Sequence, residues 1–498
     1  MTVRGAAIET VRAVRVVGPG SEFLLGDEPV DLHLADGRIV DIAPTGALPA
    51  RGEVLDAGGL WAVPGLWDNH VHTVQWALAA ERVPLGAADS PAAAAALMRD
   101  APVLADGRRV GSGFRDALWA DRPTLALLDA STGSIPTYLI NADVHSVWLN
   151  SAALAREGFR GDDGVLREED AFEISRRLNA VDPGHSDLAV IRAGDAAAAR
   201  GVTGLVDFDM AWNADAWPRR IRAGFAAHRV EFAFYPADLD RAIAAGLRSG
   251  ELHEEADVPE HAKGLIRVGS LKIITDGSLG TRTAACSHPY PGDPENFGVL
   301  TVPEDQLVSL LTTATAAGLS VAAHAIGDRA VTSVLDAFTA TGATGSMEHA
   351  QLVRHADLAR FARLGVIASV QPQHAVDDRD LVEHHWSEQT AVGYPLATLR
   401  GAGAELRFGS DAPVAPLDPW QAMASAVWRT DDARPAWHPE ERLTVDQALA
   451  ASVRSALRPG EPADVVLTAV DPRTADASAL RAMPVAATLL AGRVTYVS

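Results

Sequence analysis

Hydrophobic and polar positions alternate over short distances at both ends of the chain. Three strand-like runs near the start are separated by turn residues such as Asp36-Gly37, and the same pattern returns near the end. The runs extend over Val11 to Val17, Val30 to Leu34, Arg38 to Ile42, Ala463 to Thr468 and Ala487 to Val497. They predict one small antiparallel β module to which both chain ends contribute.

Between these ends, short apolar runs alternate with longer segments of helical composition. This is the pattern of βαβ units with a parallel sheet. The runs are Trp61 to His72, Thr203 to Phe208, Val230 to Tyr235, Leu265 to Thr275, Leu319 to His324, Thr344 to His349, Val366 to Gln371 and Leu406 to Asp411. Eight runs predict an α/β fold, a (β/α)8 TIM barrel. The long segment after the first run, at about 74–200, predicts an inserted subdomain.

Composition narrows the class of protein. The 498 residues are 48% hydrophobic, which is enough for a large core, and the formal charge is −22. Such a charge disfavours nucleic acid and anionic membranes as partners. The single cysteine, Cys286, excludes an intramolecular disulfide, and no apolar run reaches the length of a membrane span. With no secretory signal pattern at Met1 to Thr10, we expect a cytoplasmic protein.

Two histidines close the first apolar run, in Trp61-Ala-Val-Pro-Gly-Leu-Trp-Asp-Asn-His-Val-His. Residues two apart on a strand point to the same face, so His70 and His72 would both face the barrel interior at the carboxyl end of the strand. Barrel enzymes keep their active sites at that end. Taken alone, the pair is explained equally well by histidines that bind no ligand.

Three more potential ligands close later runs: His324, His349 and Asp411. Each also has a purely structural explanation. His324 could be a hydrogen-bonded core histidine, His349 could belong to a helix start, and Asp411 could cap the following segment. Together with His70 and His72, however, they would bring imidazole and carboxylate groups from four strand ends to one place. That ligand set suits Zn²⁺ or a similar divalent ion.

Lysine is rare in this chain, since 43 basic residues include only Lys263 and Lys272. Lys272 lies inside an apolar run, where an unpaired ammonium group is costly. An amine, unlike a guanidinium group, can react with CO₂ to form a carbamate that bridges two metal ions. A lysine paired with Asp276, or one exposed at the strand end, is the alternative, and the neighbouring ligands favour the carbamate.

These residues amount to a resemblance. The order His-x-His, Lys, His, His, Asp on successive strands resembles the amidohydrolase superfamily. The flanking motifs are similar to amidohydrolase family 3, the branch that includes N-substituted formamide deformylases: Asp276-Gly-Ser-Leu-Gly-Thr-Arg-Thr, His324-Ala-Ile-Gly-Asp-Arg-Ala, Glu348-His-Ala-Gln, Ser369-Val-Gln-Pro-Gln-His and Gly409-Ser-Asp-Ala-Pro-Val. The resemblance implies a metal-dependent hydrolase barrel over 63–457, and a composite β-sandwich from 1–62 and 458–498.

The resemblance also implies roles for individual residues. The metal ligands would be His70, His72, His324, His349 and Asp411, with Lys272 as a carboxylated bridge between one or two divalent ions. Asp411 would in addition move a proton from the attacking water to the leaving nitrogen. His145 would orient the substrate carbonyl, although Val144 stands where the family has glycine. Glu168, in Gly164-Val-Leu-Arg-Glu, is the alternative bridge if Lys272 is unmodified.

The expected activity is hydrolysis of a small amide, because a bound divalent cation activates water and polarises a carbonyl. Arg282 and His374 follow predicted strand ends and are candidates for substrate binding. Candidates for an apolar pocket wall are Trp67, Trp76, Trp119 and Trp148. A cyclic amide, an ester or an N-acyl amino acid would suit the same site, and a noncatalytic scaffold is the alternative of another class. We expect the partner to be a small-molecule amide and not a nucleic acid or a membrane. The sequence does not determine the oligomeric state, and a homodimer is one possibility.

Overall fold

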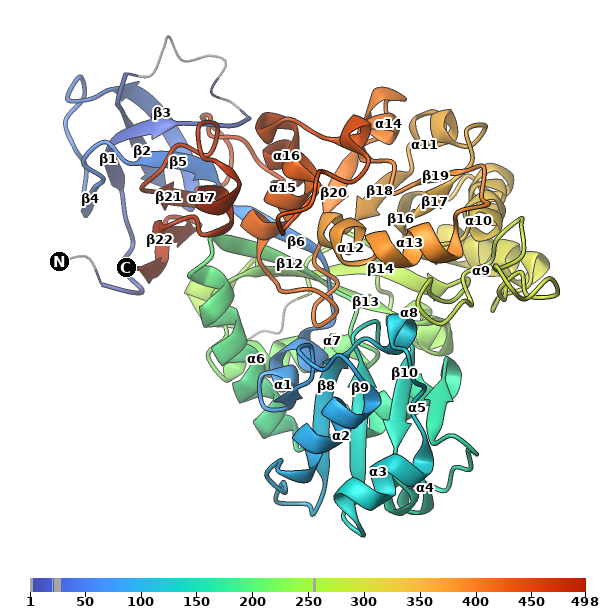
Figure 1. Cartoon of the computed structure of the whole chain (residues 1–498). Helices are drawn as coiled ribbons and strands as arrows, with labels where there is room; N and C mark the ends of the chain where they lie inside the picture. The colour runs from blue at the N-terminus through green and yellow to red at the C-terminus, as the bar shows by residue number, and fades with distance from the viewer. Residues whose placement is uncertain (1–2, 20, 22–27, 254–256) are drawn as a thin grey trace.

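A parallel barrel forms the centre of the computed structural model, which describes residues 3–19, 21, 28–253 and 257–498 (Figure 1). Eight strands make one sheet, and neighbours in the sheet are also neighbours among these strands along the chain. They are β6 (Leu66–Val71), β12 (Val202–Asp207), β13 (Arg229–Phe234), β14 (Ile266–Ile274), β15 (Val321–Ala325), β16 (Gly345–His349), β18 (Ile367–Val370) and β20 (Leu406–Phe408). The predicted (β/α)8 barrel is confirmed.

The barrel closes where β6 meets the segment that follows β20, and we call this contact the closing seam. The backbone amide of Asp411 donates to the carbonyl of His70 at 2.7 Å, and the amide of His72 donates to the carbonyl of Ala412 at 3.0 Å. A side chain at Gly409 would not fit, because its Cβ would lie 2.6 Å from the backbone nitrogen of His70. Glycine therefore permits the close backbone approach at this point.

Helices cover the outside of the barrel (Figure 1). In α10, for example, Val331, Val334, Leu335 and Phe338 are buried, which is the spacing of a helix with one apolar face. The helices that follow the insertion are α7 (Asn213–Arg222), α8 (Leu239–Ala244), α9 (Glu304–Ala316), α10 (Asp328–Thr341), α11 (Leu358–Leu364), α12 (Pro372–Asp377), α13 (Arg379–His385), α14 (Leu396–Gly401), α15 (Pro419–Trp428), α16 (Val445–Ala451) and α17 (Ala477–Arg481).

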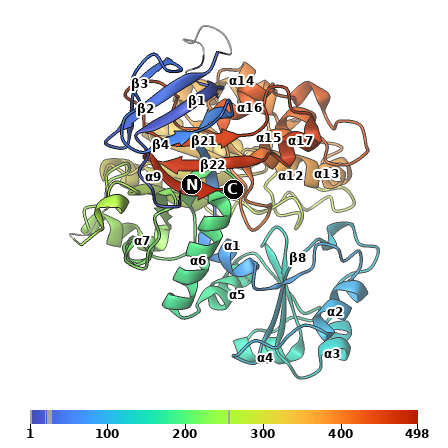
Figure 2. The same cartoon turned by 90° about the vertical axis from the view of Figure 1, so that its left-hand side faces the viewer.

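Strands from both chain ends share a second sheet (Figure 2). Its order is β23-β22-β21-β5-β1-β2-β3, and β4 pairs with β1. The strands are β1 (Thr10–Val16), β2 (Val30–Ala35), β3 (Arg38–Pro44), β4 (Val54–Asp56), β5 (Trp61–Pro64), β21 (Val465–Thr468), β22 (Val485–Leu490) and β23 (Arg493–Val497). Side chains from both ends, including Val11, Leu32, Val465 and Leu489, form its buried core. The two ends are therefore held together by hydrophobic burial as well as by backbone pairing.

The first apolar run, predicted as one strand from Trp61 to His72, divides between the two sheets. Strand β5 pairs with β1 and β21 in the terminal sheet, whereas β6 begins the barrel at Leu66. Gly65 lies at the crossing, where a Cβ would approach Thr203 Oγ1 to 2.2 Å. The apolar run alone did not show this division, because an apolar pattern shows burial without showing which sheet a segment joins.

The segment after the first barrel strand folds as a subdomain below the barrel (Figures 1 and 2). Its sheet has the order β11-β10-β9-β8-β7. The strands are β7 (Val83–Pro84), β8 (Arg109–Phe114), β9 (Thr137–Asn141), β10 (Ser146–Leu149) and β11 (Val165–Arg167). The helices are α1 (Thr73–Ala79), α2 (Pro91–Arg99), α3 (Leu125–Thr132), α4 (Ser151–Glu157), α5 (Glu169–Asn179) and α6 (Pro183–Ala198). This is the predicted insertion.

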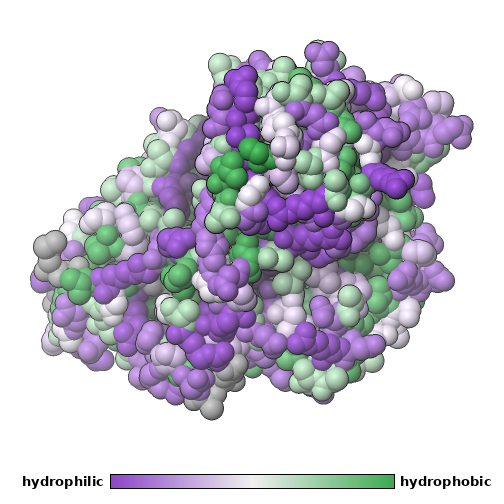
Figure 3. Space-filling model, turned by 90° about the horizontal axis from the view of Figure 1, so that it is seen from below, coloured by the Kyte–Doolittle hydropathy of each residue, from purple (hydrophilic) through white to green (hydrophobic). Residues whose placement is uncertain are grey.

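Polar and apolar side chains are interspersed on the face seen from below (Figure 3). Within the described ranges, no helix is both long and apolar enough to cross a membrane.

The buried His228 predicts a pH-dependent stability. Its side chain is fully buried and, among the described residues, neither ring nitrogen has a partner; burial lowers its pKa to about 3. The unfolded chain takes up this proton near pH 6.5 while the folded chain does not. The contribution of His228 to the free energy of unfolding is therefore complete above pH 6.5. It falls by up to about 1.4 kcal/mol per pH unit until the pH reaches about 3.

Urea unfolding of wild type and His228→Leu at pH 7 and pH 5 measures this contribution. Between pH 7 and pH 5, the free energy of unfolding should fall by about 2 kcal/mol less in the variant than in wild type. His261→Leu, at an exposed histidine, should retain the wild-type pH dependence. Equal losses in wild type and His228→Leu would contradict the assignment.

Candidate metal centre

The six predicted ligand residues lie at the carboxyl ends of the barrel strands. Four are on strands, whereas His72 is the N-cap of α1 and Asp411 follows β20. All six are buried: His70, His72, Lys272, His324, His349 and Asp411. The backbone of His349 and of Asp411 is left-handed, with φ of 74° and 58°. Strained conformations of this kind tend to occur at functional sites.

Two distances among His70, His72 and Asp411 match those of a tetrahedral metal site. The Nε2 atoms of the two histidines each lie 3.4 Å from Oδ1 of Asp411. Ligand atoms at about 2.0–2.1 Å from a tetrahedral Zn²⁺ are separated by roughly 3.3–3.4 Å, so the spacing already matches. These three residues form one of the described groups whose ligand atoms lie within 4.8 Å of one another.

A second group combines His349, His374 and Asp411. His324 stands beside it, with its ring centroid 4.5 Å from that of His349. Its Nε2 lies 3.3 Å from both the carbonyl of Gly277 and Oδ1 of Asp276, so Nε2 carries the hydrogen and Nδ1 is the nitrogen left for a ligand. The structure thus adds His374, predicted to bind substrate, to the residues able to hold a second ion.

Two side chains behind the histidines set their tautomers. The Nδ1–H of His70 donates to Oε2 of Glu348 at 2.6 Å. The Nδ1–H of His349 donates to Oε1 of Gln371 at 2.9 Å. In both rings the Nε2 lone pair is left for a metal ion. Such outer hydrogen bonds fix ring orientation and raise ligand basicity.

Asp68 and Asp276 hold the surrounding backbone. Asp68 accepts from the amides of His70 and Ser410 at 3.0 Å, and so links the two sides of the closing seam. Asp276 accepts from three backbone amides at 2.8–3.0 Å, at Ala285, Ile326 and Gly327. Asp276 is therefore not paired with Lys272. The sequence pattern indicates no role for Asp68 or Glu348, although each stands one or two residues from a predicted ligand.

Lys272 lies in a setting that favours its neutral amine. Its side chain is 2% exposed, and its Nζ lies 3.3 Å from Nε2 of His70 and 4.3 Å from the centroid of the Phe208 ring. Burial lowers the pKa of Lys272 to about 8. At pH 7 roughly a tenth of this lysine is therefore uncharged, and the uncharged amine is the form that reacts with CO₂.

The ionisation of the site suits a cation. Burial, followed by the charge of Lys272, lowers the pKa of His70 to about 4, and burial lowers that of His349 well below its usual value. Burial by itself would raise the pKa of Asp411, yet the neighbouring histidines bring it well below its ordinary range. Neutral imidazoles beside an ionised carboxylate are the protonation states that metal binding requires.

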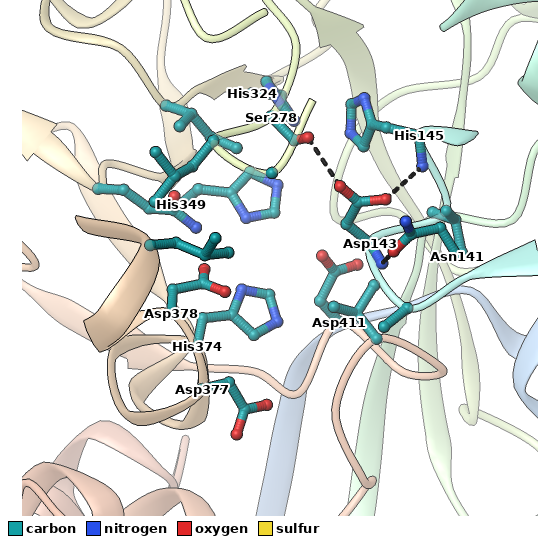
Figure 4. Close-up of a pocket in the computed structure, with 18 of the residues that line it drawn as sticks. Asn141, Asp143, His145, Ser278, His324, His349, His374, Asp377, Asp378 and Asp411 are labelled. Atoms are coloured by element: carbon teal, nitrogen blue, oxygen red, sulfur yellow. Dashed lines mark hydrogen bonds between the residues drawn. The ribbon is translucent and has the colours of Figure 1, made fainter. Parts of the chain in front are cut away.

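These residues form the floor of a cavity of about 1130 Å³, counted out to its open mouth. His145 lies on the opposite side, contributed by the insertion (Figure 4). Its Nδ1 is 2.9 Å from Oε2 of Glu168, whose other oxygen accepts from Thr281 and Thr283 at 3.0 and 2.6 Å. Glu168 therefore supports His145 from behind. Neither Glu168 nor Arg282 is among the described residues that line the cavity.

The four tryptophans considered as pocket residues lie elsewhere. Trp67 packs in the barrel interior with Phe208, and Cζ of Arg454 lies 4.1 Å from the centroid of its ring. Trp119 and Trp148 belong to the core of the insertion, and Trp76 packs against a separate cluster near the start of the barrel. The apolar part of the cavity wall is instead formed by smaller side chains such as Phe172, Met210 and Leu381.

Comparison with known proteins decides the family. A family model described as amidohydrolase family matches residues 53–496. The chain belongs to the amidohydrolase family. Its relatives include the N-substituted formamide deformylase of Arthrobacter pascens, 25% identical with 91% of each chain covered. Another is Protein LONG AFTER FAR-RED 3 of Arabidopsis thaliana, 28% identical over 93% of this chain and 88% of the relative.

A solved structure extends the comparison. An uncharacterized metal-dependent hydrolase from Pyrococcus horikoshii superposes with a TM-score of 0.77 at 25% identity, over 94% of this amidohydrolase and 99% of that chain. The resemblance drawn from the motifs is thereby confirmed, as is the barrel with a terminal β domain and an insertion.

Glu348 provides a test of ligand positioning in this amidohydrolase. Glu348→Gln should weaken metal binding by about 10–100-fold, because the carboxylate that orients His70 is lost while the side-chain volume is kept. Competition with a chromophoric chelator measures the affinity. Glu405→Gln, at an exposed glutamate paired with Arg407, is the matched control. Unchanged affinity in Glu348→Gln would show that His70 needs no such support.

Proposed function

We propose that this amidohydrolase is a zinc-dependent hydrolase that cleaves a non-peptide carbon–nitrogen bond, an amide, in a small substrate. The proposal depends on one observation: the ligand atoms of His70, His72 and Asp411 lie within 4.8 Å of one another at the base of an open cavity. The formamide deformylase relative supports the choice of an amide.

Asp411 has two roles in the proposed reaction. A bound divalent ion with an open coordination position lowers the pKa of water toward neutrality and polarises a carbonyl. Asp411 is ionised at neutral pH, because the adjacent histidines lower its pKa against the effect of burial. Its carboxylate takes the proton from the attacking water and returns it to the leaving nitrogen. The same residue thus holds the ion and transfers the proton.

His145 orients the substrate from the opposite wall. The Glu168 carboxylate accepts its Nδ1 hydrogen and, despite the opposing effect of burial, raises the pKa of His145. The same hydrogen bond helps to lower the pKa of Glu168 to about 2, again against its burial. A histidine held in this way can donate a hydrogen bond to a substrate carbonyl.

Lys272 is proposed to carry a carbamate. Its neutral amine attacks CO₂, a nitrogen–carbon bond forms, and the displaced proton leaves to solvent. The product carries two oxygens and one negative charge beside His70, and could serve two ions. A noncatalytic scaffold is disfavoured, because the chain carries all the ligand residues that the motif resemblance implies.

Metal removal tests the activity. Dialysis against a chelator should abolish amine release from a panel of N-substituted formamides and other small amides, and added Zn²⁺ should restore it. Asp411→Asn should lower kcat by roughly 10²–10⁴-fold, since proton transfer is lost. Asp380→Asn, at an exposed position on α13, should keep the wild-type kcat. Full turnover by metal-free protein would overturn the proposal.

Lysine substitution tests the bridge. Lys272→Arg cannot form the carbamate, so metal content per chain should fall from two ions to one or none. Native mass spectrometry should show one labile CO₂ adduct in wild type and none in the variant. Lys263→Arg alters the other lysine of the chain, which is exposed and pairs with Glu260, and should change neither readout. Equal metal content in Lys272→Arg and wild type would exclude the bridge.

A further inference from the structure

Four carboxylates line the cavity beyond the metal centre, and we call them the acidic wall: Asp116, Asp143, Asp377 and Asp378. They come from distant elements. Asp116 begins a 3-10 turn (Asp116–Leu118) in the insertion, and Asp143 lies in the turn between β9 and β10. Asp377 ends α12 and Asp378 follows it. The barrel and the insertion therefore direct acidic side chains into one space (Figure 4).

The acidic wall has few positive charges to balance it. Apart from Lys272 at the metal centre, Arg115 is the one arginine or lysine among the described residues that line the cavity. Arg115 is already paired with Asp377, at 2.8 Å. No ion pair within 4.0 Å joins Asp116, Asp143 or Asp378 to an arginine or lysine of the described chain. The part of the cavity that these carboxylates line is therefore negatively charged.

Neutral groups are the hydrogen-bond partners of the three unpaired carboxylates. Asn141 donates to Asp116 at 2.8 Å, Ser278 donates to Asp143 at 2.9 Å, and the Tyr394 hydroxyl donates to Asp378 at 2.6 Å. These bonds hold the carboxylates in place without cancelling their charge. Burial raises the pKa of Asp116, and the neighbouring Asp143 carboxylate raises it further. A cation bound in the cavity would favour the ionised form of such carboxylates.

His374 lies beside the acidic wall and, through the group that it forms with His349 and Asp411, also beside the metal centre. Its ring lies between the Asp377 and Asp378 side chains and faces the cavity (Figure 4). The residue is 5% exposed, and its Nε2 has no hydrogen-bond partner among the described residues. Its ring is stacked on that of His349, with centroids 6.3 Å apart and planes 11° apart. A buried polar atom without a partner in a cavity wall calls for one from the occupant.

We propose that the acidic wall binds a cationic group, an ammonium or a quaternary ammonium, carried by the substrate. This inference rests on the proposed function, because it places the scissile amide at the metal centre and the cation at the wall. Apolar side chains such as Phe172, Met210, Leu279 and Leu381 line the rest of the cavity and suit a short alkyl spacer. An N-acyl amino acid is disfavoured as substrate, because its carboxylate would meet four carboxylates and a guanidinium group that is already paired.

A series of matched amides tests the charge preference. Formamides and acetamides of short alkyl amines would carry a trimethylammonium, tert-butyl or carboxylate terminus, so that the first two differ in charge and hardly in shape. The metal-loaded enzyme should show kcat/KM at least about tenfold higher for the cation than for the tert-butyl compound, and lowest for the carboxylate. Equal kcat/KM for the cationic and neutral compounds would overturn the inference and leave the proposed hydrolysis intact.

Variants of the wall locate the preference. Asp378→Asn and, separately, Asp116→Asn keep an acceptor oxygen for Tyr394 and Asn141 but remove the charge. Each should reduce the ratio of cationic to neutral kcat/KM about tenfold, mainly through KM. Asp380→Asn, paired with Arg434 outside the cavity, should keep the wild-type ratio. A ratio unchanged in both wall variants would overturn the inference.

Calorimetry separates the two proposals. Binding of a short alkyl trimethylammonium ion and of its tert-butyl analogue can be measured without turnover. Tighter binding of the cation, with no amide of the series cleaved, would support the acidic wall and overturn the proposed amide hydrolysis.

Discussion

The closing seam of the barrel is the constraint on which the candidate metal centre depends. Backbone hydrogen bonds join His70 to Asp411 and His72 to Ala412 across the two ends of the strand series. Gly409 permits this approach because a side chain there would collide with His70. The ligands that are farthest apart along the barrel sequence are thereby brought within 3.4 Å. Without closure, the imidazoles and the carboxylate would lie on opposite edges of an open sheet.

Burial gives these groups their chemical character. Removing imidazoles from water disfavours their charged form, and it leaves His70 and His349 neutral with available lone pairs. Burial by itself would raise the pKa of Asp411, but that pKa lies well below its ordinary value, partly through the hydrogen bond with His72, so the carboxylate remains ionised. Glu348 and Gln371 accept hydrogen bonds from the buried Nδ1 atoms of His70 and His349, and these bonds orient the two rings. The same low-polarity setting lowers the pKa of Lys272 and makes its amine reactive.

Both the barrel and the insertion contribute residues to the cavity. The barrel strands supply the residues that would hold the ion, and the family match covers this part of the chain. The insertion supplies His145, Asp116 and Asp143 from the opposite side. Loops can change while a barrel floor is kept, which is how one fold serves many substrates. The family match over residues 53–496 includes both parts, and residues of both parts line the cavity.

Local pattern was sufficient for the barrel, because parallel strands are largely buried on both faces and leave short apolar runs, several of which end at a candidate ligand. The order of those runs predicted that His70, His324, His349 and Asp411 would share one barrel mouth, and their role as ligands stays a prediction. Pattern could not show that Trp61–Pro64 joins the terminal sheet. Nor could it show that Glu348 orients a histidine 278 positions away, or that Asp143 of the insertion contacts Ser278 of the barrel. These relations depend on contacts between distant segments, which only tertiary packing decides.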